Sequence, residues 1–308
     1  MIIRALELYC GIGGFAAAVS GTNVCVAAAL DQSPSALSVY RLNFPGHDAR
    51  QANLETITAR ELVSFGADFW WMSPPCQPYT VRGARRDLED PRALSFIRLL
   101  KILEQMREEA LPSHLALENV AGFGESEARR RLTETLTGKG FHVQETFLCP
   151  TSLGIPMRRP RYYLAASRKG LIPFNHLPAK KMKPLSRYLD ADDDEHMSGD
   201  LKVPGEVLKT FGPGLRILAV SDPAAYTTCF TSGYGRSIMH SGSYLRVSGG
   251  VRRISPEEIL RLLHFPQGLR FPDGMPLRKK WQLAGNSLSV AAVRRILEVF
   301  TGIEGGDE

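Results

Sequence analysis

The sequence predicts an α/β fold of the nucleotide-binding type, accompanied by a second, smaller and irregular domain. Short apolar runs alternate with helix-like stretches through the first 170 residues, a pattern typical of strands and crossover helices in a mostly parallel sheet. A glycine turn follows the first apolar run, as in a Rossmann-like fold. From about residue 171 to 250 the chain becomes rich in Gly, Pro and Ser and loses its periodicity. We therefore assign residues 1–170 and 251–308 to the α/β domain and 171–250 to the irregular one.

The first elements follow from local pattern. Residues 3–9 read Ile-Arg-Ala-Leu-Glu-Leu-Tyr, which is apolar and β-branched at its start, and predict a strand that runs into Cys10-Gly11-Ile12-Gly13-Gly14. The Ala-rich stretch after this turn predicts a helix. A second strand, 24–30, ends at an acidic residue and is followed by a helix over 33–43. This strand–turn–helix–strand order is the opening of a nucleotide-binding unit.

The pattern continues through the centre of the chain. A short strand near 49–54 precedes a helix over 58–65, and the wholly apolar segment 69–72 predicts a buried strand. A long amphipathic helix is expected over 91–109, and another apolar strand over 114–117.

The last predicted elements belong to the C-terminal half. Residues 141–149 and 161–167 predict a pair of strands. Ser-Pro-Glu-Glu is a favourable helix start and predicts a helix over 255–263. Gly285-Asn286-Ser287 opens a final helix, expected over 288–300.

Composition excludes some classes of protein. Net charge +6 and a pI near 9.1 are compatible with a polyanionic partner. The five Cys are scattered and form no Cys-x-x-Cys pair, which argues against a disulfide framework or a zinc site and for a reducing compartment. No secretion signal or long apolar span is visible, so a cytoplasmic location is expected.

Cys76 is the strongest candidate nucleophile. It follows the strand 69–72 within Ser-Pro-Pro-Cys-Gln-Pro, where three prolines in five positions fix φ and remove backbone donors. The thiol is therefore expected on a stiff, non-helical turn at a strand end, which is where open α/β sheets place their chemistry. A lone Cys is more often a small buried hydrophobe. Rigid presentation at a strand end suits a nucleophile better.

Two acidic residues at strand ends each have two interpretations. Asp31 lies about 20 residues after the glycine turn, where a carboxylate can accept hydrogen bonds from ribose hydroxyls. It could equally cap the helix that follows. The turn and the acid together favour an adenosine-containing cofactor. Glu118 closes an apolar strand, where a carboxylate is costly unless it caps a helix or works at a site.

Two sets of arginines follow these segments. Arg82, Arg85 and Arg86 come just after the candidate nucleophile. Such a run is usually a solvated face, but guanidinium groups in this position could instead hold phosphates. Arg159 and Arg161 alternate in an extended chain, so both are expected on one face of it.

The motifs, taken in order, resemble the DNA cytosine-5 methyltransferase family. The order is glycine turn, acid, Pro-Pro-Cys-Gln, Glu-Asn-Val, Arg-x-Arg and Gly-Asn-Ser. The resemblance covers the chain outside 171–250. Cys229-Phe230-Thr231, followed by Gly-Tyr-Gly, is similar to the signature of the family's tRNA-methylating, type-two branch.

The resemblance implies a Rossmann-like methyltransferase domain, with 171–250 as the target-recognition domain. The family implies S-adenosyl-L-methionine as cofactor, and the branch implies a cytosine in the anticodon loop of tRNA, tRNA-Asp, as substrate. No metal and no membrane partner is expected, and weak DNA binding is a secondary expectation. A stacked cytosine must be turned outward before it can react.

The resemblance also assigns roles to residues. It implies that the Cys76 thiolate adds to C6 of cytosine, that Glu118 hydrogen-bonds N3, and that Arg159 and Arg161 contact O2 and keep the surroundings of the thiolate positive. The implied cofactor contacts are Tyr9, Gly11, Ile12, Gly13, Gly14, Asp31, Gln32, Asn53, Leu54, Pro75, Asn286 and Ser287. The implied nucleic-acid contacts are Arg82, Arg85, Arg86, Cys229, Phe230, Thr231 and Tyr234.

Other functions compete with this one. A DNA cytosine-5 methyltransferase of a restriction-modification system shares the catalytic motifs, so the choice of RNA rests on Cys229-Phe230-Thr231 and its neighbours. A non-catalytic, cofactor-dependent RNA-binding module would not need an intact catalytic set. A dinucleotide oxidoreductase fits the glycine turn alone, and nothing at Cys76 or Glu118 supports hydride transfer.

Overall fold

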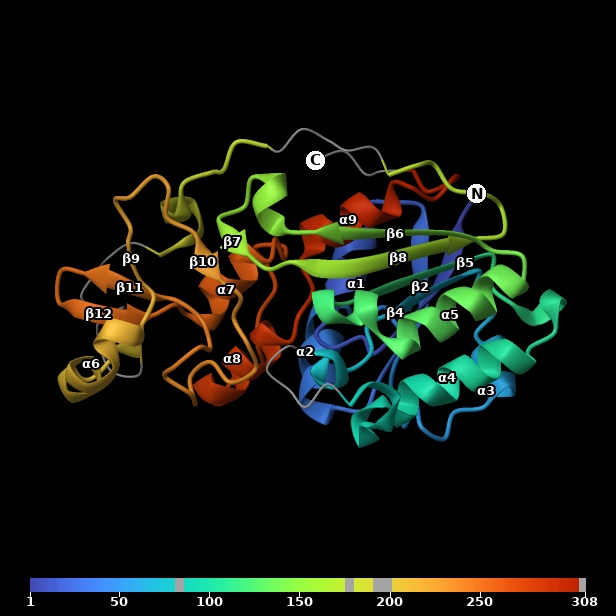
Figure 1. Cartoon of the computed structure of the whole chain (residues 1–308), viewed down its shortest axis with the longest axis horizontal. Helices are drawn as coiled ribbons and strands as arrows, with labels where there is room; N and C mark the ends of the chain where they lie inside the picture. Colours follow the sequence, from blue (N-terminus) through green and yellow to red (C-terminus); the bar gives the residue numbers. More distant parts are fainter. Residues whose placement is uncertain (81–85, 175–179, 191–200, 305–308) are drawn as a thin grey trace. The chain divides into compact units, whose positions relative to one another are not determined.

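The computed structural model describes residues 1–80, 86–174, 180–190 and 201–304. The chain divides into two compact units, each made of more than one stretch of sequence. The first unit comprises Met1–Leu148, Pro160–His176 and Val293–Glu308, and the second comprises Cys149–Arg159 and Leu177–Ala292. Figure 1 shows the elements of both units, coloured along the chain.

The second unit is larger than the irregular domain predicted from the sequence. Besides 177–250 it takes in 149–159 and 251–292, which the sequence analysis assigns to the α/β domain. Long-range strand pairing contributes to this difference, because β7 (Met157–Arg158) pairs in parallel with β10 (Thr227–Thr228). How function is divided between the two units stays a prediction.

The first unit is built on a seven-stranded sheet of order β3-β2-β1-β4-β5-β8-β6. Neighbours among β1 to β5 pair in parallel, while β8 is antiparallel to both β5 and β6. Parallel strands end at the same edge of a sheet, so the segments that follow β1, β4 and β5 meet there. The strands are β1 (Ile3–Leu8), β2 (Val24–Asp31), β3 (Ala49–Gln51), β4 (Phe69–Met72), β5 (His114–Val120), β6 (His142–Leu148) and β8 (Arg161–Ser167).

Helices pack on both faces of this sheet. On one face Leu6, Trp70 and Leu115 belong to a core shared with α3, α4 and α5, and Figure 1 shows α4 and α5 side by side. On the other face Phe15 of α1 stacks on Trp71, with ring centroids 5.2 Å apart. The helices are α1 (Gly14–Val19), α2 (Pro34–Asn43), α3 (Ala59–Ser64), α4 (Leu94–Gln105), α5 (Glu127–Gly138) and α9 (Val290–Leu297), the last of which begins in the second unit.

The structure changes some predicted bounds. The strands over 69–72 and 161–167 have the bounds predicted from the sequence. The helix predicted over 91–109 is shorter, because 3₁₀ turns flank α4 on both sides. Helix α5 is not predicted from the sequence. Its buried side chains are few (Ala128, Leu132 and Leu136), so the apolar pattern is weak.

The second unit is more regular than the sequence suggests. A three-stranded sheet has the order β12-β11-β9. Helix α7 starts at the predicted place, because Ser255 and Glu258 form a capping box. Besides β7 and β10, the elements are β9 (Ile217–Ala219), β11 (Tyr244–Val247), β12 (Gly250–Arg253), α6 (Gly205–Phe211), α7 (Pro256–Leu262) and α8 (Leu277–Gly285).

The described residues contain neither a helix that could span a membrane nor a group of possible metal ligands. Among them, no helix has both the length and the apolar character needed to cross a bilayer. Nor do three or more His, Cys, Asp or Glu side chains of the described ranges gather in a way that could hold a metal ion.

A fully buried carboxyl lies next to the glycine turn. The Glu7 side chain of β1 accepts a hydrogen bond from the Phe15 backbone N–H (3.3 Å) and another from the Tyr40 hydroxyl (3.0 Å). The Tyr40 hydroxyl also contacts His47 Nδ1, at 3.1 Å. Burial raises the pKa of Glu7 from 4.5 to about 8, because the hydrogen bonds only partly offset desolvation. The side chain is therefore mostly protonated at neutral pH.

This raised pKa predicts a pH-dependent stability. The folded state binds one more proton than the unfolded state between the two pKa values, so the contribution of Glu7 is complete below pH 4.5 and is lost as pH rises through about 8. Glu7→Gln keeps a neutral amide at this place, so the decline of its free energy of unfolding from pH 5 to pH 8 should be shallower than that of the wild type. Urea unfolding across this range, with exposed Glu89→Gln as control, measures both slopes. Equal slopes would show that Glu7 is ionised in the folded protein.

Candidate active site

Cys76 lies just beyond the end of β4, at the carboxyl edge of the sheet. It is half-buried, and its backbone (φ −85°, ψ −17°) is helical. Its carbonyl accepts a hydrogen bond from Tyr79 N–H (3.0 Å), so Cys76 opens a 3₁₀ turn over Gln77–Tyr79. The predicted non-helical turn is therefore wrong at this residue. Pro78 lies in the first turn of this helix, a position that tolerates a missing N–H.

The segment before Cys76 is tied to two neighbouring strands. Asn119, almost fully buried at the end of β5, donates from Nδ2 to the Pro74 carbonyl (3.1 Å). Ser73 N–H donates to the Leu8 carbonyl of β1 (3.3 Å). Asn119 belongs to the Glu-Asn-Val motif, but the sequence alone predicted no role for it. An amide in an otherwise apolar strand was the available signal, because a buried amide needs a partner.

Glu118 is paired with Arg161 in the first unit. Glu118 Oε1 and Arg161 Nε lie 3.2 Å apart, and both side chains are about nine-tenths buried. The antiparallel pairing of β5 with β8 places Arg161 opposite Val120, two residues beyond Glu118. The next 3₁₀ turn has Val120 as its N-cap and no side-chain cap. The helix-cap interpretation of Glu118 is therefore wrong. Glu118 is instead a carboxylate paired with an arginine at the edge of the sheet.

A further cation lies near the candidate nucleophile. Arg92 makes a bidentate ion pair with Asp90, with distances of 2.8 and 2.6 Å. Hydrogen bonding to Asp90 raises the pKa of Arg92, and a negative charge on Cys76 raises it further. Arg92 is thus within electrostatic range of a thiolate. Arg92 is not predicted from the sequence, because its nearness to Cys76 depends on the tertiary structure.

The glycine turn has the backbone that its sequence requires. Tyr9, Gly11 and Gly13 have positive φ values of 59°, 55° and 93°. A Cβ at Gly13 would lie 2.4 Å from the Phe44 ring, so this glycine serves close packing. A Cβ at Gly11 would meet no heavy atom of the described residues within 4 Å. A ligand can therefore approach the backbone at Gly11, which fits an adenosine-containing cofactor.

Asp31 connects the glycine turn to the following helix. Its Oδ2 accepts from Gly11 N–H and its Oδ1 from Ser33 N–H, both at 2.8 Å. The cap of α2 is Ser33, which accepts from Ala36 N–H, so the helix-cap interpretation of Asp31 is wrong. Burial raises the pKa of Asp31, although these backbone hydrogen bonds counteract it.

The other predicted cofactor contacts have mixed environments. In the first unit Ile12 and Leu54 are buried, at 2% and 3% exposure. Asn53 is exposed, and its Oδ1 accepts from Glu55 N–H. Gly14 begins α1, Gln32 is exposed and Pro75 is half-buried, and in the second unit Asn286 is exposed and Ser287 is buried. Their contact with a cofactor stays a prediction.

Arg159 joins two sequence motifs within the second unit. Its side chain is buried, and Nη1 lies 3.2 Å from Cys229 Sγ and 3.3 Å from the carbonyls of Phe230 and Gly285. Nη2 donates to the Ser287 carbonyl at 2.6 Å. Arg159 Nε is buried and has no acceptor among the described residues. A ligand oxygen could fill this role, since a buried donor without an acceptor is costly.

The segment Cys229-Phe230-Thr231 and the segment Gly285-Asn286-Ser287 can lie this close together only because residue 285 is glycine. A Cβ at Gly285 would lie 2.5 Å from the Thr231 carbonyl oxygen, and a backbone atom cannot move aside cheaply. Gly285→Ala should therefore lower the free energy of unfolding by about 1–3 kcal/mol. Gly212→Ala is the matched control, because a Cβ there meets nothing within 4 Å among the described residues. Chemical denaturation of both variants measures the difference, and equal stabilities would contradict the close approach.

Two of the predicted nucleic-acid contacts, Phe230 and Tyr234, are buried in the structure. Phe230 and Tyr234 are 1% and 0% exposed, and their rings pack against each other. The Tyr234 hydroxyl donates to the Ser243 carbonyl at 2.7 Å, so this residue supports the turn from inside. Direct stacking of RNA on either ring is inconsistent with this burial. Thr231 is exposed.

The basic loop is only partly covered by the structure. Arg86 is exposed and begins the short 3₁₀ turn that follows it. Arg82 and Arg85 lie outside the described residues. Contact of this loop with phosphates stays a prediction.

The doubly wound sheet, the open glycine turn and the cysteine at a strand end are those of a cofactor-dependent α/β methyltransferase. The family model described as C-5 cytosine-specific DNA methylase matches residues 3–301, and the chain belongs to this family. The resemblance inferred from the sequence is thereby confirmed. Transfer by this family requires a methyl donor.

Near relatives match the chain over nearly its whole length. The tRNA (cytosine(38)-C(5))-methyltransferase of Schizosaccharomyces pombe is 30% identical, covering 97% of this chain and 96% of the relative. The DNA (cytosine-5)-methyltransferase of Dictyostelium discoideum is 28% identical over 97% and 94%. The crystal structure of the S. pombe Dnmt2 methyltransferase superposes with a TM-score of 0.84, at 29% identity, over 96% of this chain and 97% of that one.

Proposed function

We propose that this protein transfers a methyl group from S-adenosyl-L-methionine to C5 of a cytosine in the anticodon loop of tRNA, with tRNA-Asp as the expected substrate. The observation that carries the proposal is the nearly full-length likeness to the tRNA methyltransferase of S. pombe. The Cys229-Phe230-Thr231 signature supports the same branch. A DNA substrate is the alternative, as the name of the D. discoideum relative indicates. A cytoplasmic location remains a prediction.

The chemistry begins with Cys76. Its thiolate adds to C6 of cytosine, forming an S–C6 bond, and the electron pair of the C5–C6 double bond moves into the ring toward N3. Negative charge builds on N3 and O2. Glu118 shares a proton with N3 and so stabilises the negative charge on that atom. The pairing of Glu118 with Arg161 holds the carboxyl group in position. We propose that the guanidinium groups of Arg159 and Arg161 hydrogen-bond O2. The buried Nε of Arg159, which has no acceptor among the described residues, supports that role.

The ring then reacts at C5. The electron-rich C5 takes the methyl group as its bond to the donor's sulfonium sulfur breaks and that electron pair stays on sulfur. A base removes the C5 proton, and the C–H electron pair re-forms the C5–C6 double bond as the Cys76 thiolate is expelled. The electron pair of the S–C6 bond returns to sulfur, so the Cys76 thiolate is regenerated. The tie between Asn119 and the Pro74 carbonyl supports this role, because it restrains the backbone just before the nucleophile.

We assign the methyl donor to the glycine turn. When bound, S-adenosyl-L-methionine supplies an electrophilic methyl group on a sulfonium. The open space beside Gly11 leaves its backbone accessible, and the two hydrogen bonds of Asp31 hold that turn against the start of α2. Leu54 is buried, and its contact with adenine rests on the resemblance.

The test compares two nucleic acids. A tRNA-Asp transcript and a cytosine-rich DNA duplex are incubated with the protein and S-adenosyl-L-methionine at equal concentration and moderate salt, and 5-methylcytosine is located by bisulfite sequencing. We expect methylation of one anticodon-loop cytosine and little on the duplex. Equal rates on both would assign the protein to DNA instead.

The salt dependence of tRNA binding tests the basic loop independently. Phosphate contacts release counterions, so tRNA binding should weaken with salt at a logarithmic slope of about −0.7 per contact in single-stranded regions. Reversing the charge at Arg85 and Arg86 should weaken binding and flatten this slope, while S-adenosyl-L-methionine affinity stays the same. An unchanged slope would remove the loop from the RNA interface.

A further inference from the structure

The second unit contains a cavity of about 520 Å³. Its lining comes from three places: residues 186–190, the turn that follows β9, and the hairpin of β11 and β12. Small-molecule sites have volumes of roughly 300–1,000 Å³, so this cavity is large enough for a single nucleotide. None of the residues that line it has a role in the reaction described above.

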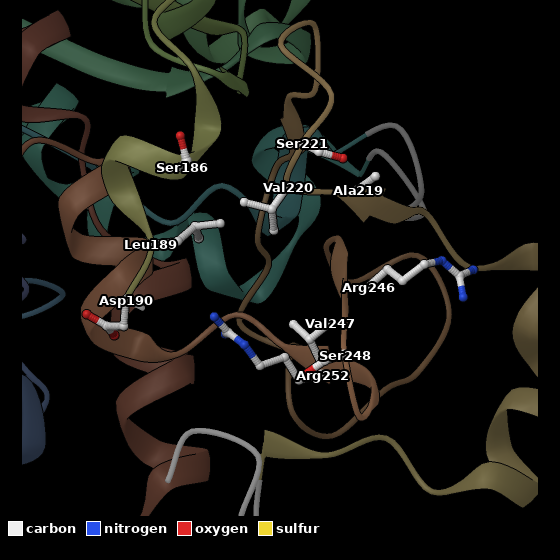
Figure 2. Close-up of a pocket in the computed structure, with 10 residues that line it drawn as sticks. All are labelled: Ser186, Leu189, Asp190, Ala219, Val220, Ser221, Arg246, Val247, Ser248 and Arg252. Carbon is white, nitrogen blue, oxygen red and sulfur yellow. The ribbon is translucent and has the colours of Figure 1, made fainter. Parts of the chain in front are cut away.

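One wall of the cavity is apolar. Figure 2 shows the side chains of Leu189, Val220 and Val247 directed toward one another across it. Val247 is buried, while Leu189 and Val220 are half-buried and present surface to a ligand. Aliphatic side chains of this kind suit the flat face of a heterocyclic base. Serine hydroxyls at 186, 221 and 248 supply hydrogen-bonding groups around the rim.

The charges at the back of the cavity are already compensated. Arg252, almost fully buried, donates to both carboxylate oxygens of Glu258, at 2.8 and 2.7 Å. The Asp190 carboxylate pairs with Arg261 at 2.5 Å, and its backbone N–H donates to Glu258. Removing one partner of the buried Arg252–Glu258 pair destabilises the fold strongly, so Arg252 is unsuited to mutation as a test.

Arg246 is the cation that can serve a ligand. It belongs to β11, its side chain is exposed, and it has no ion-pair or hydrogen-bond partner among the residues that the structure describes. In Figure 2 it extends away from Asp190, at the opposite side of the cavity. The cavity therefore combines an apolar wall, rim hydroxyls and one exposed guanidinium. This combination matches a base joined to a phosphate.

We infer that this cavity binds one unstacked nucleotide of the RNA substrate, with its base against Leu189, Val220 and Val247 and its phosphate on Arg246. The inference rests on the proposed RNA substrate. RNA loops, unlike duplexes, expose bases that can be splayed out and held in pockets. The net charge of +6 favours a polyanion over a neutral metabolite or an uncharged peptide.

Two variants test the pocket in different ways. Val220→Trp fills the cavity from a turn outside any strand, and Arg246→Glu reverses the charge at its rim. Each should raise the Kd for a tRNA-Asp transcript about tenfold, the scale of one lost base or phosphate contact, and leave S-adenosyl-L-methionine affinity unchanged. The charge-matched control is Arg60→Glu, an exposed arginine of α3 in the first unit, which should have a much smaller effect. Circular dichroism melting checks the fold, and Arg246→Glu, at an exposed site, remains usable if Val220→Trp does not fold.

An abasic scan identifies the bound nucleotide. Each anticodon-loop position of the transcript is replaced in turn by an abasic residue, and Kd is measured with the wild type and with Val220→Trp. We expect one position, other than the methylated cytosine, where the loss of the base weakens wild-type binding about tenfold but adds little to the defect of Val220→Trp. If Val220→Trp does not fold, Arg246→Glu takes its place in the scan, and strictly additive effects of Arg246→Glu and every abasic position would contradict the pocket.

The outcomes separate the two proposals. Failure of the wild type to bind or methylate tRNA would overturn the proposed function and this inference with it. A wild type that methylates tRNA, together with pocket variants that bind it as tightly as the Arg60→Glu control, would overturn the pocket alone. Strictly additive effects of Val220→Trp and every abasic position would do the same.

Discussion

Cys76→Ala should abolish methyl transfer and leave S-adenosyl-L-methionine binding unchanged. The alanine removes the thiolate that adds to C6, and without this addition C5 is a poor nucleophile. Loss of a nucleophile costs several orders of magnitude, so the turnover number should fall on the order of 10³-fold or more. Tritium transfer from labelled S-adenosyl-L-methionine to tRNA measures the rate, and calorimetry measures cofactor affinity.

The matched control is Cys25→Ala, which removes an exposed thiol from β2 of the same unit. It should retain full activity. A tRNA carrying 5-fluorocytosine at the target should form a covalent complex with the wild type and with Cys25→Ala, because fluorine blocks loss of the C5 substituent. No complex should form with Cys76→Ala. Residual transfer by the alanine variant above a hundredth of the wild-type rate would exclude the covalent mechanism.

Glu118→Gln should reduce turnover by roughly 10²-fold or more. The amide can still donate a hydrogen bond to N3, but it cannot share or pass a proton, so charge on the ring is less well relieved. The ion pair of Glu118 with Arg161, at 3.2 Å, is lost as well. Cofactor affinity should change little, because the glycine turn predicted to hold the cofactor is fixed by the hydrogen bond from Gly11 N–H to Asp31.

Loss of an ion pair alone must be separated from loss of the acid. Glu104→Gln serves as control, since Glu104 makes a bidentate pair with Arg131 on the helices α4 and α5. It breaks a comparable pair outside the strand-end segments and should leave turnover nearly unchanged. If Glu118→Gln behaves in the same way as Glu104→Gln, Glu118 holds Arg161 in place and takes no part in proton sharing.

Local pattern was sufficient for much of the fold. The strand over 69–72 is wholly apolar and is buried on both faces of a parallel sheet, so its type and bounds could be predicted from four residues. The start of α7 followed from Ser255 and Glu258, whose capping box involves residues three apart. Helix α5 escaped prediction because packing against α4, not an apolar repeat, stabilises it.

The candidate site was predictable where it depends on chain order. Cys76 follows β4, and Glu118 lies near the end of β5, which pairs with β4 in the sheet, so their placement at one edge follows from the α/β pattern. The glycine turn was likewise predictable, because its positive φ values depend on the glycines of the turn itself.

By itself the sequence determined the order of the strands along the chain, the turns and the candidate nucleophile, because these depend on neighbours a few residues apart. The tertiary structure alone decided which partners the side chains meet. Arg159 and Arg161 share a motif, yet one binds the carbonyls of Gly285 and Ser287 while the other pairs with Glu118. Tyr234 proved to be buried for the same reason: a side chain's partners are set by segments far away in sequence, whose approach no local pattern encodes.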